Sequence, residues 1–235
     1  MGAAALAVDA ALKSGCGYVK LTTSEKVKLA LAATYPQVIY LDEPDFSSQS
    51  IAVGMGLGIS EEVYSLIKNL LLNYRGTLII DADGLNSLAR YGINILREKL
   101  CSVILTPHIK EFSRLTGISV EEISKDPKNL ARSFSKKYNV ITLLKGADSI
   151  ITDGETLTVN SRGSTALAKA GSGDMLSGYM CGSAARGLAP LDAAVCAAYT
   201  MGLSAEISSK QKTDYCATAK DILNNLHLAV KRLTE

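Results

Sequence analysis

The stretch Ala168–Gly182, AKAGSGDMLSGYMCG, determines how the rest of the sequence is interpreted. Its small residues Gly171–Gly173 permit a sharp turn, and apolar residues then recur at helical spacing, which predicts a helix over 174–185. The first N–H groups of such a helix have no internal partner and lie at the positive end of its dipole. The turn is therefore either an anion hole suited to phosphate, with Asp174 placed to accept a proton, or an ordinary glycine turn in which Asp174 caps the helix.

The composition indicates one globular domain over residues 1–235. The chain is 47% hydrophobic and 20% charged, and its 25 basic and 23 acidic residues are interspersed, which argues against a nucleic-acid-binding surface. The five cysteines form no CxxC pair and only two histidines accompany them, so we expect reduced thiols and no zinc site. Because no signal peptide and no membrane-spanning run is evident, we predict a cytoplasmic protein without membrane contact.

Short apolar stretches alternate with helix-forming stretches along the chain. This alternation predicts a parallel α/β sheet covered by helices. The sequence around Asp153–Gly154 indicates a hairpin between strands at 149–152 and 156–159. The predicted helix over 2–14 precedes every strand, so we also expect that a first strand is absent from this chain.

Polar and glycine-rich motifs follow four of the predicted strands. They begin after Val53, Ile80, Leu105 and Leu144. Because ligands of open α/β sheets bind outside the carboxyl ends of the strands, these motifs predict one binding site at that edge.

The individual candidates differ in how strongly they indicate a site. Lys145 can place a cation against phosphate, or it is an ordinary lysine at the end of a strand. His108, one of two histidines, favours a site role. Asp81 and Asp83 can bind a hydroxyl or a metal-bound water, or can cap a helix. Asn86 is expected on the same side of the chain as Asp83.

Five motifs occur in the order and spacing of a known family: VGMGLG (Val53–Gly58), DADGLN (Asp81–Asn86), LTPHIKE (Leu105–Glu111), LLKGADSII (Leu143–Ile151) and AGSGDMLSG (Ala170–Gly178). Through them the chain resembles the ADP/ATP-dependent NAD(P)H-hydrate dehydratases, carbohydrate-kinase-like proteins related to ribokinase folds. The glycine–aspartate loop marks only the wider superfamily, whereas DADGLN with TPHxxE is more particular to the dehydratases. The resemblance covers nearly the whole chain and implies a three-layer α/β/α fold with a mainly parallel central sheet.

The resemblance implies that the protein repairs nicotinamide cofactors damaged by addition of water. ADP or ATP, with Mg²⁺, would drive the dehydration of hydrated NADH or NADPH, and Asp174 would take the proton of the added hydroxyl. Self-association into a homo-oligomer is also expected. The implied nucleotide-binding residues are Lys145, Gly146, Ala147, Asp148, Ser149, Gly171, Ser172 and Gly173. The implied substrate-binding residues are Ala3, Gly56, Gly58, Asp83, Asn86, His108, Glu111 and Asp174.

The chain departs from the family pattern in three places. The family's opening strand and GGS-type turn are expected to be missing ahead of the first helix. Residues 108–111 read His-Ile-Lys-Glu where the family has His-Pro-Gly-Glu, and Ser161–Gly163 replaces an Asn-Pro-Gly segment. Two other functions stay open: a kinase for a vitamin-like alcohol, with Asp174 as the same base, and a non-catalytic nucleotide-binding relative.

Overall fold

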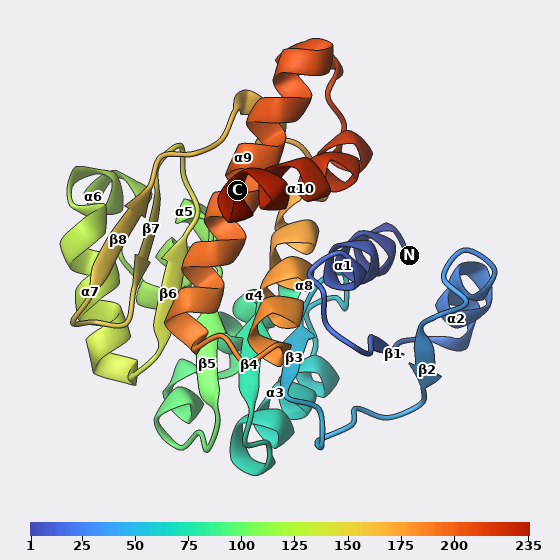
Figure 1. The fold of residues 1–235 in the computed structure, drawn as a ribbon. Helices are drawn as coiled ribbons and strands as arrows, with labels where there is room; N and C mark the ends of the chain where they lie inside the picture. The colour runs from blue at the N-terminus through green and yellow to red at the C-terminus, as the bar shows by residue number, and fades with distance from the viewer.

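A six-stranded sheet lies at the centre of the computed structural model, which describes residues 1–235 (Figure 1). Its strands are ordered β3-β4-β5-β6-β7-β8. The first four run parallel, and β7 and β8 are antiparallel additions at one edge. The mainly parallel sheet and the hairpin are thus confirmed. The bounds are β3 (Ser50–Val53), β4 (Thr77–Ile80), β5 (Ser102–Leu105), β6 (Ile141–Leu144), β7 (Ser149–Thr152) and β8 (Leu157–Asn160).

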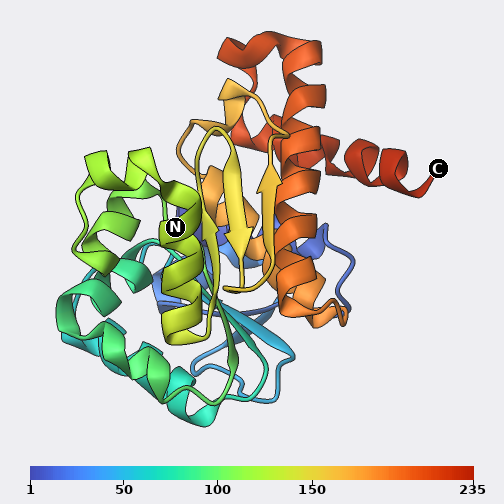
Figure 2. The same ribbon diagram turned by 90° about the vertical axis from the view of Figure 1, so that its left-hand side faces the viewer.

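Helices cover both faces of this sheet and complete the predicted three layers (Figure 2). Along β4, Leu78 and Ile80 join one core and Ile79 joins the other, because side chains of a strand alternate between its faces. One layer holds α3 (Glu61–Asn73), α4 (Asp83–Tyr91), α5 (Ile109–Thr116), α6 (Val120–Lys125) and α7 (Pro127–Tyr138), with the short 3₁₀ helix η1 (Ile93–Arg97). The other holds α1 (Gly2–Leu12), α8 (Ser172–Ala185), α9 (Pro190–Cys216) and α10 (Ala219–Thr234), with η2 (Thr165–Leu167).

Helix α4 is an element that the sequence pattern did not predict. Its first turn is the polar DGLN of the DADGLN motif, and its buried residues Leu85 and Leu88 recur at helical spacing. Helix α8 begins at Ser172, two residues before the predicted start. Helix α9 runs to Cys216, and Thr213 interrupts it with a φ of 66°.

The strands β1 (Lys20–Thr22) and β2 (Ile39–Leu41) form a separate parallel pair. With α2 (Glu25–Ala32) they lie beside α1, apart from the main sheet (Figure 1). A hollow of about 530 Å³ lies between α1, β1 and the outer edge of β3. Of the predicted site motifs, the glycine turn after β3 and residues 178, 181 and 182 of α8 border this hollow. No helix has the length and apolar character needed to cross a membrane.

Helix α8 packs on α1 so closely that only glycine fits between them. A Cβ atom at Gly178 would lie 2.1 Å from the carbonyl oxygen of Ala7. A Cβ atom at Gly182 would lie 1.9 Å from the hydroxyl oxygen of Ser14. This contact fixes α8 between α1 and the sheet, with its N-terminus at the carboxyl ends of the strands.

Candidate functional site

The carboxyl ends of β3–β6 bring the predicted motifs to one edge. Beyond the strands, the Asp81 N–H donates to Val53 O (3.1 Å) and the Thr106 N–H to Ile80 O (3.2 Å). One step further, the Lys145 N–H donates to Pro107 O (2.8 Å). The loops therefore leave the sheet in register, and their side chains meet as the sequence motifs predict.

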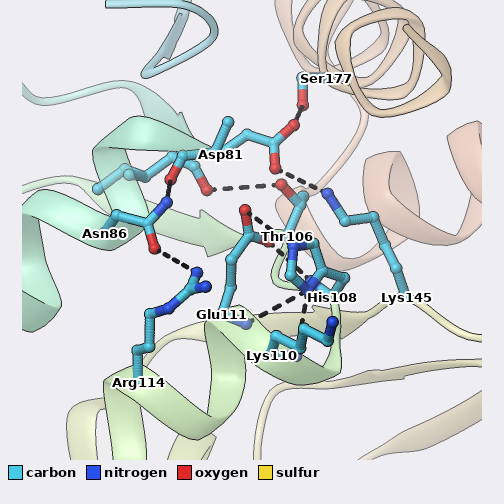
Figure 3. Close-up of polar contacts among 11 residues, drawn as sticks. Asp81, Asn86, Thr106, His108, Lys110, Glu111, Arg114, Lys145 and Ser177 are labelled. Atoms are coloured by element: carbon cyan, nitrogen blue, oxygen red, sulfur yellow. Dashed lines mark hydrogen bonds and ion pairs between the residues drawn. The ribbon is translucent and has the colours of Figure 1, made fainter. Parts of the chain in front are cut away.

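A buried carboxylate lies at the centre of this edge (Figure 3). Asp81 is 1% exposed, and its Oδ1 accepts from the Lys145 ammonium (2.8 Å) while its Oδ2 accepts from the Ser177 hydroxyl (2.9 Å). Burial alone would raise the pKa of Asp81, but the Lys145 charge and the hydrogen bonds from Lys145, Thr106 and Ser177 hold it below its ordinary value. Asp81 is thus an ionised group whose oxygens are already engaged.

Asp174 lies near Asp81 in the first turn of α8, but its carboxylate makes no hydrogen bond. Burial raises the pKa of Asp174, and the neighbouring Asp81 carboxylate raises it further. Lys145 and the amino group of Met1 offset part of this rise. A carboxylate with a raised pKa and free oxygens is suited to accept a proton.

The N-terminus of α8 carries unpaired backbone donors, and the alternative in which Asp174 caps this helix is wrong. The N-cap is Gly171 with a φ of 94°, and no side chain caps the helix. The backbone N–H groups of Gly173 and Asp174 have no hydrogen-bond partner. The hydroxyl of Ser172 is buried and also unpartnered. A Cβ atom at Gly173 would lie 3.3 Å from Asp81 Oδ2 and 3.4 Å from Lys145 Nζ, so the pair flanks these free donors.

The other predicted nucleotide-binding residues form the turn between β6 and β7. Lys145 points inward to Asp81, and Ser149 begins β7. The three residues between them are exposed: Gly146, Ala147 and Asp148. This turn offers accessible backbone beside a positively charged side chain.

His108 and Glu111 form a reciprocal cap on α5. His108 Nδ1 accepts from the N–H groups of Lys110 (3.1 Å) and Glu111 (3.3 Å), while Glu111 Oε2 accepts from the His108 N–H (2.9 Å). The Ile-Lys replacement in this loop therefore leaves the cap intact. Burial lowers the pKa of His108, and the charges of Lys145 and Arg114 lower it further against the opposing effect of Glu111. The imidazole is therefore neutral at neutral pH, with the proton assigned to Nε2 by this geometry.

The remaining predicted substrate-binding residues surround the glycine turn after β3. A Cβ atom at Gly56 would lie 3.4 Å from the Ala3 Cβ, so these two residues are neighbours. The Gly58 N–H donates to Asp83 Oδ2 (2.8 Å). Asn86 instead turns toward α5, where its Oδ1 accepts from Arg114 (2.9 Å; Figure 3).

Three residues of the site were absent from the predicted set. Asp81 was a candidate for binding a hydroxyl or a metal-bound water or for capping a helix, and not for pairing with a lysine, whereas Ser177 and Arg114 were not considered. Ser177 lies three residues after Asp174, hence on the same side of α8, and this spacing was the available signal. The position of Arg114 depends on how α4 packs on α5, which the sequence pattern does not specify.

Comparison with known proteins agrees with this geometry. The family model described as NAD(P)H-hydrate dehydratase matches residues 1–227. The bifunctional NAD(P)H-hydrate repair enzyme of Dictyoglomus turgidum is 31% identical over 97% of this chain, and that of Thermofilum pendens is 32% identical over 100%. The chain spans about half the length of these relatives, 48% of each.

A solved structure extends the comparison to the fold. The ADP/ATP-dependent NAD(P)H-hydrate dehydratase of Bacillus subtilis, co-crystallised with ATP and Mg²⁺ and soaked with CoA, superposes with a TM-score of 0.89 at 30% identity. The match covers 98% of this chain and 87% of that one, so the ribokinase-like fold expected from the motifs is confirmed. The chain belongs to the NAD(P)H-hydrate dehydratase family.

Proposed function

We propose that this chain dehydrates hydrated NADH or NADPH in a reaction that consumes ADP or ATP and restores the reduced cofactor. The observation that carries the proposal is the placement of Asp174. Its carboxylate has a raised pKa and no hydrogen-bond partner, and it lies beside Lys145 and the free N–H groups of α8. A general base next to an anion site is the arrangement that phosphoryl transfer to a hydroxyl requires.

The proposed reaction has two steps. First, Asp174 takes the proton of the added hydroxyl of the substrate. The hydroxyl oxygen attacks the terminal phosphorus of the nucleotide, and the bond from that phosphorus to the leaving oxygen of the nucleotide breaks. Lys145 and the N–H groups at Gly173 and Asp174 stabilise the charge on the transferred group. Second, the ring nitrogen donates its electron pair as the carbon–oxygen bond breaks. Phosphate departs, and loss of a ring proton restores the double bond.

The proposed nucleotide contacts are the exposed turn after β6 and the α8 loop: Lys145, Gly146, Ala147, Asp148, Ser149, Gly171, Ser172 and Gly173. The buried, unpartnered Ser172 hydroxyl supports this assignment, because such groups usually find a partner. The residues assigned to the hydrated cofactor are Ala3, Gly56, Gly58, Asp83, Asn86, His108, Glu111 and Asp174 itself. Neutral His108 can exchange a hydrogen bond there without adding charge.

Mg²⁺ has no ready-made cage in this chain. No cluster of three or more His, Cys, Asp or Glu side chains is placed to hold a metal ion, and the oxygens of Asp81 are engaged. Mg²⁺ usually keeps several waters and binds through substrate phosphates. We therefore expect it to arrive with the nucleotide, where it neutralises phosphate charge, and we assign it no protein step.

The proposal also covers self-association, the cellular compartment and the class of ligand. Exposed apolar side chains on the β1–α2 side, Tyr18 at 80% and Leu29 at 70% exposure, support self-association. Five unpaired cysteines fit a reducing compartment such as the cytoplasm. The balance of charge supports small-molecule ligands and no nucleic acid.

The test is recovery of reduced-nicotinamide absorbance from hydrated NADH and hydrated NADPH, with ADP and with ATP, in the presence of Mg²⁺. We expect recovery with at least one nucleotide and release of phosphate. A stable phosphorylated alcohol without recovery would identify a kinase. Nucleotide binding without any turnover would identify a non-catalytic relative.

A further inference from the structure

We propose that Asp81 is a positioning residue that holds the Lys145 ammonium against Gly173, at the mouth of α8, where the nucleotide phosphates bind. The inference rests on the proposed function for the identity of the ligand. It adds a role for a residue that would touch neither substrate nor nucleotide.

The first support is the way in which Asp81 is itself fixed. Its N–H donates to Val53 O (3.1 Å) and its carbonyl accepts from the Gly84 N–H (3.0 Å). A Cβ atom at Gly54 would lie 2.0 Å from that same carbonyl, so the glycine turn packs directly on it. The backbone of Asp81 is therefore anchored by two neighbouring segments, the end of β3 with its turn and the first turn of α4, before its carboxylate contacts Lys145.

The second support is the energetic cost of the ion pair. The Asp81 side chain is 2% exposed and that of Lys145 is 23% exposed. Removing charges from water costs about as much as their attraction returns, so a buried pair adds little net stability compared with apolar residues of similar size. Stability alone does not account for an Asp at the end of an otherwise apolar strand.

The third support is the geometry that the pair creates. Lys145 uses one of its three N–H donors on Asp81, which leaves two for a ligand. Its Nζ lies 3.4 Å from the position of a Cβ on Gly173, next to the free N–H groups of α8. Without Asp81, no other contact would hold the flexible four-carbon side chain of Lys145 at this position.

Asp81 also connects this cation to the base. Its Oδ2 accepts from Ser177, which lies one turn after Asp174 on α8. The same hydrogen bond therefore ties the first turns of α8, which carry Asp174, to the end of β4. The charges that face Asp174 are Asp81, Lys145 and the amino group of Met1.

The experiment compares Asp81→Asn with the unchanged chain in three measurements: calorimetric binding of ADP and ATP, turnover of hydrated NADPH, and turnover against pH. We expect the Kd of the nucleotides to rise about 10- to 100-fold, as for the loss of a charge-assisted contact. Turnover by Asp81→Asn should also persist to a lower pH than turnover by the unsubstituted protein. The reason is that Asp81 raises the pKa of Asp174 by more than Lys145 lowers it.

Two further variants separate an effect on nucleotide binding from a general loss of stability. Ser177→Ala removes one hydrogen bond but leaves both charges paired, so the protein should fold and the nucleotide Kd should rise about two- to fivefold. Ser135→Ala is the matched control, because its buried hydroxyl bonds Thr142 (2.7 Å) away from the site. It should lower Tm and leave the Kd and the pH profile unchanged.

An unchanged nucleotide Kd in folded Asp81→Asn and Ser177→Ala, or a pH profile that does not move in Asp81→Asn, would overturn the positioning role. Because binding is measured directly, this result is distinguishable from failure of the proposed function. If the proposed function failed, the unsubstituted protein would bind nucleotide but would not restore the reduced cofactor.

Discussion

The two glycine turns of the site look alike in sequence but differ in what their N–H groups do. In the turn after β3, the Gly58 N–H is already bonded to Asp83, and Gly54 packs against the Asp81 carbonyl. In the turn before α8, the N–H groups of Gly173 and Asp174 are free and face a lysine. The first turn supports its neighbours, and the second is available to an anion. A glycine motif therefore indicates phosphate binding only when its donors are unpartnered.

The strongest test of this difference is Asp174→Asn in the second turn. The amide keeps the shape of the carboxylate but cannot accept the proton. Turnover should fall about 10²- to 10⁴-fold, the usual contribution of a general base. The nucleotide Kd, measured by calorimetry, should change little. Turnover that persists at the original rate would show that another group is the base.

In the first turn, Gly54→Ala should act on stability. The added methyl would lie 2.0 Å from the Asp81 carbonyl at a residue whose φ is 115°. The β3 and β4 loops would have to separate, so we expect a loss of roughly 3 kcal/mol or more in the free energy of unfolding. Urea denaturation measures it. Gly187→Ala is the matched control, because its φ is also positive and its Cβ would meet open space.

Gly173→Ala in the second turn should act on nucleotide binding. Its φ is not in the left-handed region, and the methyl would press on Asp81 Oδ2 and Lys145 Nζ at 3.3 and 3.4 Å. We expect the nucleotide KM to rise about tenfold with a small change in Tm, because the far end of a lysine can yield. An equal effect of Gly58→Ala on the nucleotide KM would remove the distinction between the turns.

The smallest effect is expected from Ala82→Gly, between Asp81 and Asp83. Ala82 has φ 49° and ψ −117°, a conformation that side chains disfavour, and the cost of such strain is of order 1–3 kcal/mol. Glycine relieves it but loses more entropy on folding. We expect the free energy of unfolding, measured by thermal denaturation, to rise by about 1 kcal/mol. Loss of stability instead would mean that the surrounding contacts, and not strain, dominate at this turn.

The sequence predicted which edge of the sheet carries the site, but not the protonation tendency or the hydrogen-bond partners of each side chain there. The positions of Lys145 and His108 follow from strand ends, because parallel strands deliver their loops to one side. The different protonation tendencies of Asp81 and Asp174 do not follow. They depend on burial and on Ser177 and Lys145, which lie 96 and 64 residues from Asp81 along the chain.

Among the structural elements, those with a strong local pattern were predictable. The apolar run of β4 and the Asp153–Gly154 turn are such patterns. Helix α4 was not predicted, because its polar first turn resembles a loop, although Leu85 and Leu88 recur at helical spacing. The separate β1–β2 sheet was likewise hidden, since a short strand does not specify which sheet it joins.

The glycine contact between α1 and α8 has a consequence for motion. Because α1 and the residues after it touch α8 at Gly178 and Gly182, α8 cannot roll or slide without displacing α1. Asp174 and its neighbouring N–H groups therefore form a stationary part of the proposed site. In the proposed reaction, a closing movement over the nucleotide would have to come from other segments, such as the exposed turn at 146–148. The rate of product release should then respond to changes in that turn, while the chemical step responds to α8.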